Sequence, residues 1–189
     1  MRIACLGWGS LIWNPDSLPI ASGWNDDGPE LPIEFARESA NGRMTLVLVD
    51  KSKKSPSLWA ILSATTMEAA KAELAERERI PEKNIKYSIG YWESTSGVSQ
   101  GRCVEEISTW ARNKGLDGVV WTNLKCGFRS TRDKLPEVND IVEHLNNLPP
   151  EQRALAEEYV RKAPAKVRTN VRDELERQLG WLSLNGNGS

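Results

Sequence analysis

The chain has little histidine and little cysteine: among its 189 residues there is one histidine, His144, and there are three cysteines. A single histidine excludes most metal sites and the catalytic triads that depend on histidine. Cys5, Cys103 and Cys126 are far apart and form no Cys-x-x-Cys pair, so neither a disulfide framework nor a zinc site is expected. Any acid–base chemistry therefore has to rest mainly on carboxylates.

The sequence also lacks an excess of either charge and lacks a long apolar run. The formal net charge is −1, and residues 126–189 contain as many Lys and Arg as Asp and Glu, so nucleic acid and anionic membranes are not expected partners. The apolar N-terminal stretch is broken by Gly7, Gly9 and Ser10, too early for a signal peptide or a membrane span. We therefore expect a cytoplasmic protein, and the sequence leaves the oligomeric state open.

A glycine turn follows a short apolar run, Ile3–Leu6, which has the length of a buried strand. Gly7 and Gly9 carry no Cβ, so the backbone around Trp8 can turn sharply and come close to another group. Such a turn can direct several N–H groups into one concavity that binds an anion or an oxyanion. The alternative interpretation is a plain connection between two elements. A dinucleotide-binding loop is not expected, because its third glycine would fall on Ile12.

Strands and helices are mixed as far as Leu124, and the rest of the chain is predicted to be helical. Strands are expected at 31–38 and 43–49, paired across Asn41–Gly42, and at 58–62, 86–92 and 117–124. Helices are expected at 67–79, capped by Thr65 or Thr66 and ended by Pro81, and at 103–113, 138–145, 150–160 and after Thr169. This order predicts an α+β fold with a core at 1–125, a helical cap at 126–184 packed on it, and a disordered tail at 185–189.

One carboxylate lies on the apolar side of the helix predicted at 67–79. Met67, Ala70 and Leu74 form a stripe at about 100° per residue, and Glu78 falls about 40° from Leu74 on the same arithmetic. A buried carboxylate must be hydrogen-bonded, paired or neutral, and this is a common way to prepare a general base. The alternative is that Glu78 splays to solvent at the helix end, or simply pairs with Arg77 or Lys71.

Residues 6–15 resemble the opening of the gamma-glutamylcyclotransferase-like family, in particular its glutathione-degrading branch. There a strand leads into Tyr-Gly-Ser-Leu, an apolar residue, Trp, Asn and Pro. Leu74–Glu78 matches the Leu-x-x-Arg-Glu segment that carries the family's essential glutamate, and Tyr87 or Tyr91 falls in the next expected strand. The resemblance covers about residues 2–124. It departs at Trp8, where the family has tyrosine, and at 79–81, where the family has Gly-Gly-Tyr.

The resemblance implies a small, largely closed mixed β-barrel flanked by helices and a reaction without metal or cofactor. The free α-amine of a γ-glutamyl compound would attack its own γ-carbonyl and release 5-oxoproline. Glu78, which the motif and the helical face select independently, would be the general acid and base. The residues expected to bind the substrate are Gly7, Trp8, Gly9, Ser10, Leu11, Arg37 and Tyr87.

Some residues allow more than one interpretation. Ser10 lacks a histidine to activate it, so a binding role is expected rather than a nucleophilic one. Arg37 and Arg43 flank the hairpin and would either pair with a substrate carboxylate or take part in ordinary surface ion pairs. The alternative for the whole chain is a non-catalytic member of the same fold that holds a small amino-acid-like ligand, which the departures at Trp8 and after Glu78 favour.

Overall fold

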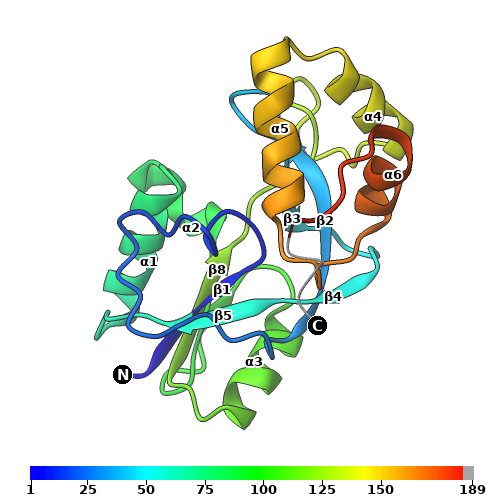
Figure 1. Ribbon diagram of the computed structural model, residues 1–189. Helices are drawn as coiled ribbons and strands as arrows, with labels where there is room; N and C mark the ends of the chain where they lie inside the picture. Colours follow the sequence, from blue (N-terminus) through cyan, green and yellow to red (C-terminus); the bar gives the residue numbers. More distant parts are fainter. Residues whose placement is uncertain (185–189) are drawn as a thin grey trace. The chain divides into compact units, whose positions relative to one another are not determined.

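The computed structural model describes residues 1–184 and shows two compact units (Figure 1). The first unit comprises residues 1–7, 11–31 and 56–124, and the second comprises residues 8–10, 32–55 and the chain from Lys125 onward. The chain therefore passes between the units several times. Both units contain strands, and a run of strands comes before the first helix while a run of helices follows the last strand, which confirms the predicted α+β class.

A five-stranded sheet forms the centre of the first unit, in the order β5-β1-β8-β6-β7. Its strands are β1 (Ile3–Gly7), β5 (Leu58–Ile61), β6 (Ile89–Glu93), β7 (Ser99–Gln100) and β8 (Gly118–Thr122). β1 runs parallel to β8 and antiparallel to β5, and β6 is antiparallel to both of its neighbours. Every residue of β1 and β8 is buried, as is typical of central strands covered on both faces. The strands expected at 3–6, 58–62 and 117–124 are confirmed.

Two helices of the first unit cover opposite faces of this sheet (Figure 1). Side chains alternate along a strand, so neighbouring residues face opposite sides. Tyr91 of β6 packs against the buried cluster that includes Met67 and Leu74 of α1 (Met67–Arg77). Its neighbour Trp92 lies on the other face, where the Arg112 guanidinium of α3 (Val104–Asn113) is 5.3 Å from the Trp92 ring centroid. The helices expected at 67–79 and 103–113 are therefore present.

The second unit contains a three-stranded sheet in the order β3-β2-β4. Its strands are β2 (Glu30–Glu38), β3 (Met44–Leu48) and β4 (Lys54–Pro56). β2 and β3 form the expected antiparallel hairpin, with Phe35 opposite Leu46 and a register shift between Phe35 and Arg37. Gly42 has φ +80° in the connecting turn, a conformation that glycine adopts without steric cost. The predicted turn at Asn41–Gly42 is confirmed.

Three helices complete the second unit: α4 (Val138–Asn146), α5 (Pro150–Lys162) and α6 (Asn170–Leu179). Thr169 caps α6 as predicted, because its hydroxyl accepts a hydrogen bond from the Arg172 N–H at 3.0 Å. Pro150 occupies the first turn of α5, where a missing N–H costs nothing. The helices expected at 138–145 and 150–160 are confirmed.

Some local expectations are wrong. The strand expected at 86–92 begins only at Ile89, because η1 (Glu82–Asn84) and α2 (Ile85–Ser88) precede it. The helix expected at 67–79 ends at Arg77, before Pro81 has any effect. β4 and β7 were not expected, because two or three mostly polar residues carry no alternating pattern.

The predicted disorder of residues 185–189 lies outside the described residues. Within residues 1–184, no helix is both long enough and apolar enough to cross a membrane. The predicted division into a core at 1–125 and a helical cap at 126–184 stays a prediction. The prediction places the hairpin region 32–55 in the core, whereas the second unit groups this region with the helices that follow Lys125.

Candidate functional site

Glu78 lies one residue beyond the last residue of α1, and its side chain is 19% exposed. The chain reverses here in a Schellman motif: the Ile80 N–H donates to the Ala75 carbonyl at 2.8 Å and the Arg79 N–H donates to the Glu76 carbonyl at 2.9 Å. Ile80 then packs against the buried cluster of the first unit, to which Leu74 belongs. This motif, rather than Pro81, ends the helix and holds the Glu78 side chain half-buried.

Arg77 joins Glu78 to the segment that follows the glycine turn. Its guanidinium donates to Glu78 Oε1 at 2.8 Å and to the Asn14 carbonyl at 2.6 Å, and its side chain is 10% exposed. Leu11 of the same segment lies in the buried cluster with Leu74. The ion pair that the sequence left open for Glu78 is therefore formed with Arg77, whereas Lys71 lies over the Tyr91 ring, 4.4 Å from its centroid.

Cys5 of β1 is fully buried and lies within electrostatic reach of Glu78. Burial raises the pKa of the Cys5 thiol well above its usual range, the Glu78 charge raises it further and the Arg77 charge lowers it. The thiol therefore stays protonated and inert as a nucleophile. The Glu78 charge therefore acts on a buried residue in the middle of β1.

Another group lies close to the backbone at each glycine of the turn, and in both cases this group is a side chain of the protein itself. A Cβ at Gly7 would lie 2.8 Å from the Trp24 ring, and a Cβ at Gly9 would lie 2.5 Å from the Tyr159 hydroxyl. The Trp8 indole is 3% exposed and its N–H donates to the Leu46 carbonyl at 3.2 Å. The predicted binding roles of Gly7, Trp8 and Gly9 stay predictions, and the structure gives each residue a packing role as well.

The two hairpin arginines contact protein groups in the second unit. The Arg37 guanidinium donates to the Lys125 carbonyl at 2.7 Å, and Arg43 Nε donates to Asn41 Oδ1 at 3.0 Å. Arg43 also lies over the Tyr159 ring, 5.4 Å from its centroid. A role for Arg37 in binding a substrate carboxylate stays a prediction.

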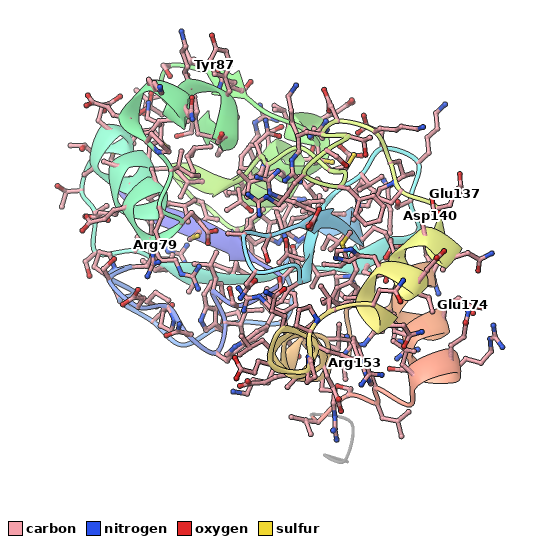
Figure 2. All side chains as sticks on the ribbon, turned by 90° about the horizontal axis from the view of Figure 1, so that it is seen from above. Arg79, Tyr87, Glu137, Asp140, Arg153 and Glu174 are labelled. Atoms are coloured by element: carbon pink, nitrogen blue, oxygen red, sulfur yellow. The ribbon has the colours of Figure 1, made fainter. Side chains whose placement is uncertain are left out.

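Tyr87 is not in the strand where the sequence placed it. It belongs to α2, its side chain is 64% exposed and it projects from the surface (Figure 2). Tyr91, the alternative that the sequence offered, lies in β6 and packs against the buried cluster behind α1. Tyr91 is therefore the better candidate for the tyrosine expected in the strand that follows Glu78.

The predicted site residues divide between the two units. Gly7, Leu11, Glu78 and Tyr87 belong to the first unit, and Trp8, Gly9, Ser10 and Arg37 belong to the second. The first unit brings Leu11 and Glu78 to the same helix end through the buried cluster and Arg77. Among the described residues, no group of three or more His, Cys, Asp or Glu side chains could hold a metal ion.

No family model matches this chain, and no curated protein or solved structure does either. The family resemblance therefore rests on the two motifs at residues 6–15 and 74–78.

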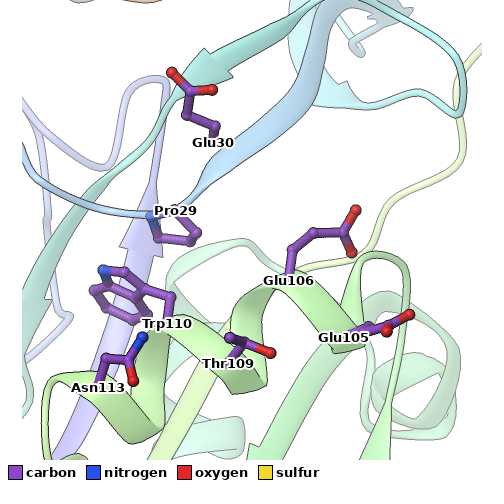
Figure 3. Close-up of a pocket in the computed structure, with 7 residues that line it drawn as sticks. All are labelled: Pro29, Glu30, Glu105, Glu106, Thr109, Trp110 and Asn113. Atoms are coloured by element: carbon purple, nitrogen blue, oxygen red, sulfur yellow. The ribbon is translucent and has the colours of Figure 1, made fainter.

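A surface groove of about 530 Å³ lies elsewhere in the first unit (Figure 3). Its lining residues are Pro29, Glu30, Glu105, Glu106, Thr109, Trp110 and Asn113. None of the predicted site residues is among them. Three carboxylates around this groove disfavour an anionic group, and a γ-glutamyl compound carries an α-carboxylate. The groove is therefore a poor fit for the expected substrate.

The sequence interpretation did not identify Tyr159 or Arg172 as important. Tyr159 contacts the glycine turn although it lies 150 positions from Gly9 in the sequence, and no local pattern predicts such a contact. Arg172 is fully buried although it falls in a stretch with several surface cations. Its position three residues after the Thr169 cap, on the apolar side of α6 between Val171 and Leu175, was the available signal.

Proposed function

We propose that the protein is a gamma-glutamylcyclotransferase-type enzyme that releases 5-oxoproline from a γ-glutamyl compound. In this reaction the substrate's α-amine attacks its own γ-carbonyl carbon and forms the C–N bond of the five-membered ring. The bond to the amine or amino acid on the other side of that carbonyl then breaks. Glu78 is the general acid and base.

The observation that carries the proposal is a half-buried carboxylate at an unfavourable helix end. The C-terminal end of a helix has a partial negative charge, so a carboxylate there costs stability, typically 0.3–1 kcal/mol. Glu78 nevertheless occupies this place, and Arg77 fixes its orientation. A residue that breaks a local stability rule is often retained for function. The placement agrees with the motif that selected Glu78.

The chemistry needs one group that first takes a proton and later returns it. The α-ammonium of the substrate is not a nucleophile, so the ionised Glu78 would accept one of its protons and then donate it to the leaving amine. An ionised carboxylate accepts hydrogen bonds only, and the Arg77 contact matches that state. Because the attack is intramolecular, holding the substrate in a cyclic conformation supplies much of the remaining rate acceleration.

The resemblance supplies the other parts of the proposal. Backbone N–H groups of Gly9, Ser10 and Leu11 would stabilise the oxyanion on the γ-carbon or bind the substrate's α-carboxylate. The proposed fold includes the largely closed mixed barrel, and the pairing of β1, parallel on one side and antiparallel on the other, supports its mixed character. A cytoplasmic location belongs to the same proposal.

The second candidate is a non-catalytic member of the same fold that binds a small amino-acid-like ligand. The observation in its favour is the Arg77 ion pair, because a paired carboxylate can serve purely to hold the loop at Asn14. The two departures from the family motif, at Trp8 and at 79–81, point the same way.

The deciding experiment compares Glu78→Gln with Glu76→Gln, a matched change at an exposed position of the same helix. The substrates are glutathione, γ-glutamyl amino acids and γ-glutamyl amines, and 5-oxoproline is quantified by mass spectrometry. Loss of general acid–base catalysis predicts about a 10²–10⁴-fold lower rate for Glu78→Gln at an undiminished melting temperature. Full activity in Glu78→Gln contradicts the mechanism, and a wild type that binds these compounds without turnover supports the binding protein.

A further inference from the structure

We propose that the Tyr159 hydroxyl is the positioning group of the glycine turn, fixing the backbone at Gly9 that the proposed function uses to bind substrate. Tyr159 comes from α5, in the part of the chain that the family resemblance does not cover. The functional half of this inference rests on the proposed function, and its structural half does not.

The first step is that the Tyr159 ring is held firmly inside the second unit. Its side chain is 6% exposed and it meets the Phe35 ring edge to face, with centroids 6.2 Å apart at 84°. The Arg43 guanidinium lies over the ring at 5.4 Å from the centroid. The hydroxyl therefore has a defined position.

The second step is that the outer edge of β3 binds both the hydroxyl and the turn. β3 is an edge strand of its sheet, and the backbone groups on its free edge need partners other than a neighbouring strand. The Leu46 N–H donates to the Tyr159 hydroxyl at 3.3 Å, and the Leu46 carbonyl accepts from the Trp8 indole N–H at 3.2 Å. Tyr159 and Trp8 are thus both hydrogen-bonded to the backbone of Leu46, one to its N–H and the other to its carbonyl.

The third step is that the hydroxyl occupies the place of a side chain at position 9. A Cβ at Gly9 would lie 2.5 Å from the Tyr159 hydroxyl oxygen, while the next Tyr159 atom, the ζ carbon, would be 3.5 Å away. Only the oxygen is closer than ordinary contact distance. Gly9 does not have a positive φ, so alanine is conformationally acceptable there. The glycine at position 9 is therefore required by the hydroxyl rather than by the backbone conformation.

This arrangement brings a tyrosine hydroxyl to a turn that has no tyrosine of its own. The family resemblance places a tyrosine at position 8, where this chain has Trp8 and the indole is directed to Leu46. The Tyr159 hydroxyl lies over the neighbouring residue instead. It acts through the turn backbone, whose N–H groups are the proposed binding groups, and so it is a positioning residue.

A double-mutant cycle tests the inference on the full chain: wild type, Gly9→Ala, Tyr159→Phe and the double variant, studied by urea unfolding and by 5-oxoproline release. Gly9→Ala should lower the unfolding midpoint in the wild-type background and have little effect in the Tyr159→Phe background, because the 2.5 Å contact is gone. Gly23→Ala is the matched control, since a Cβ there meets no atom within 4 Å and the midpoint should not fall. An equal loss for Gly9→Ala in both backgrounds overturns the inference.

The kinetic half separates positioning from simple stability. At a temperature well below both melting transitions, Tyr159→Phe should lower kcat/KM by at least tenfold, because the turn N–H groups lose their fixed orientation. Unchanged kcat and KM in Tyr159→Phe, with an active wild type, overturns the positioning role and leaves the proposed function intact. A wild type that releases no 5-oxoproline overturns the proposed function, and the stability cycle still decides whether the hydroxyl imposes the glycine.

Discussion

Arg79 has a left-handed backbone conformation, with φ +53°, directly after Glu78. The Schellman motif requires this conformation at the residue that reverses the chain, and glycine usually occupies it because a Cβ is strained there. The family resemblance places a glycine at this position. The chain therefore accepts backbone strain beside the proposed catalytic residue.

Arg79→Gly should relieve this strain and stabilise the protein by about 0.5–1 kcal/mol, after allowance for the greater freedom of glycine in the unfolded chain. Urea unfolding measures the change. Arg79→Ala is the control, because it removes the exposed guanidinium and keeps the Cβ, so it should give no comparable gain. Equal effects of the two variants would show that the side-chain charge, and not the backbone, is responsible.

Glu34 is a second carboxylate in an unusual place, 5% exposed in β2 and directed at the first turn of α6. It accepts hydrogen bonds from the Phe35 N–H at 2.8 Å and from the Val171 N–H at 3.4 Å, and it is also bonded to Thr169. Burial raises the pKa of Glu34, and these hydrogen bonds oppose the rise only in part. The charged form is thus less favourable in the folded protein than in the unfolded chain.

The raised pKa predicts the sign of a pH dependence. Above about pH 4.5 the unfolded chain loses the Glu34 proton while the folded protein still holds it, so the unfolding free energy contributed by Glu34 falls as pH rises through the folded pKa. Glu34→Gln removes this contribution. The difference in unfolding free energy between wild type and Glu34→Gln, measured by urea unfolding over a pH range that begins below 4.5, should therefore shift against the wild type as pH rises. Parallel pH profiles would contradict the prediction.

At the scale of the elements, one buried arginine joins α5 to α6. The Arg172 side chain is not exposed at all, and its guanidinium donates to the carbonyls of Val160, Ala163, Pro164 and Val167 at 2.7–3.2 Å. These carbonyls include groups at the end of α5 that have no partner within the helix. A charge this deep is tolerated because both terminal nitrogens of the guanidinium donate to carbonyls and the Glu176 carboxylate lies 3.4 Å from Arg172 Nε.

Arg172→Met should destabilise the protein by about 3–5 kcal/mol, because the thioether fills similar space and leaves the four carbonyls without donors. Thermal or urea unfolding gives the magnitude. Arg177→Met on the same helix is the matched control, since Arg177 is 67% exposed and pairs with Glu174 at the surface, and it should change stability little. A small effect at Arg172 would mean that water takes over the carbonyls.

The elements that the sequence predicted well are those with a local signal. Thr169 and Pro150 indicate the starts of helices, and the alternation along β2 indicates a strand. Each of these signals depends only on residues a few positions apart. α2 was missed, because a four-residue helix has too little periodicity to differ from a strand. The end of α1 was placed late, because the left-handed Arg79 is not a residue type that marks such an end.

At the scale of the whole molecule, the candidate site is predictable only in part. Glu78 could be selected as a candidate because the motif and the helical face are both local, and the structure adds Arg77 as its partner. The contact between Tyr159 and Gly9 could not be predicted from the sequence, because it depends on how α5 packs against β3. Long-range contacts of this kind follow from the topology of the fold, and they cannot be predicted from local sequence patterns.

The predicted boundary at residue 125 can be tested by truncating the chain. The second unit takes 32–55 from the first part of the chain and its helices from the last part, and Phe35 of the former packs against Tyr159 of the latter. In a chain truncated after Leu124, Phe35 would lose its ring contact with Tyr159. Glu34 would lose its hydrogen bond from the N-terminus of α6. Amide hydrogen exchange should then show β2 and β3 unprotected, while β1 and β8, whose cluster lies within residues 1–124, keep their protection. Full protection of β2 and β3 in the truncated chain would instead establish residues 1–125 as a core that folds without the helices.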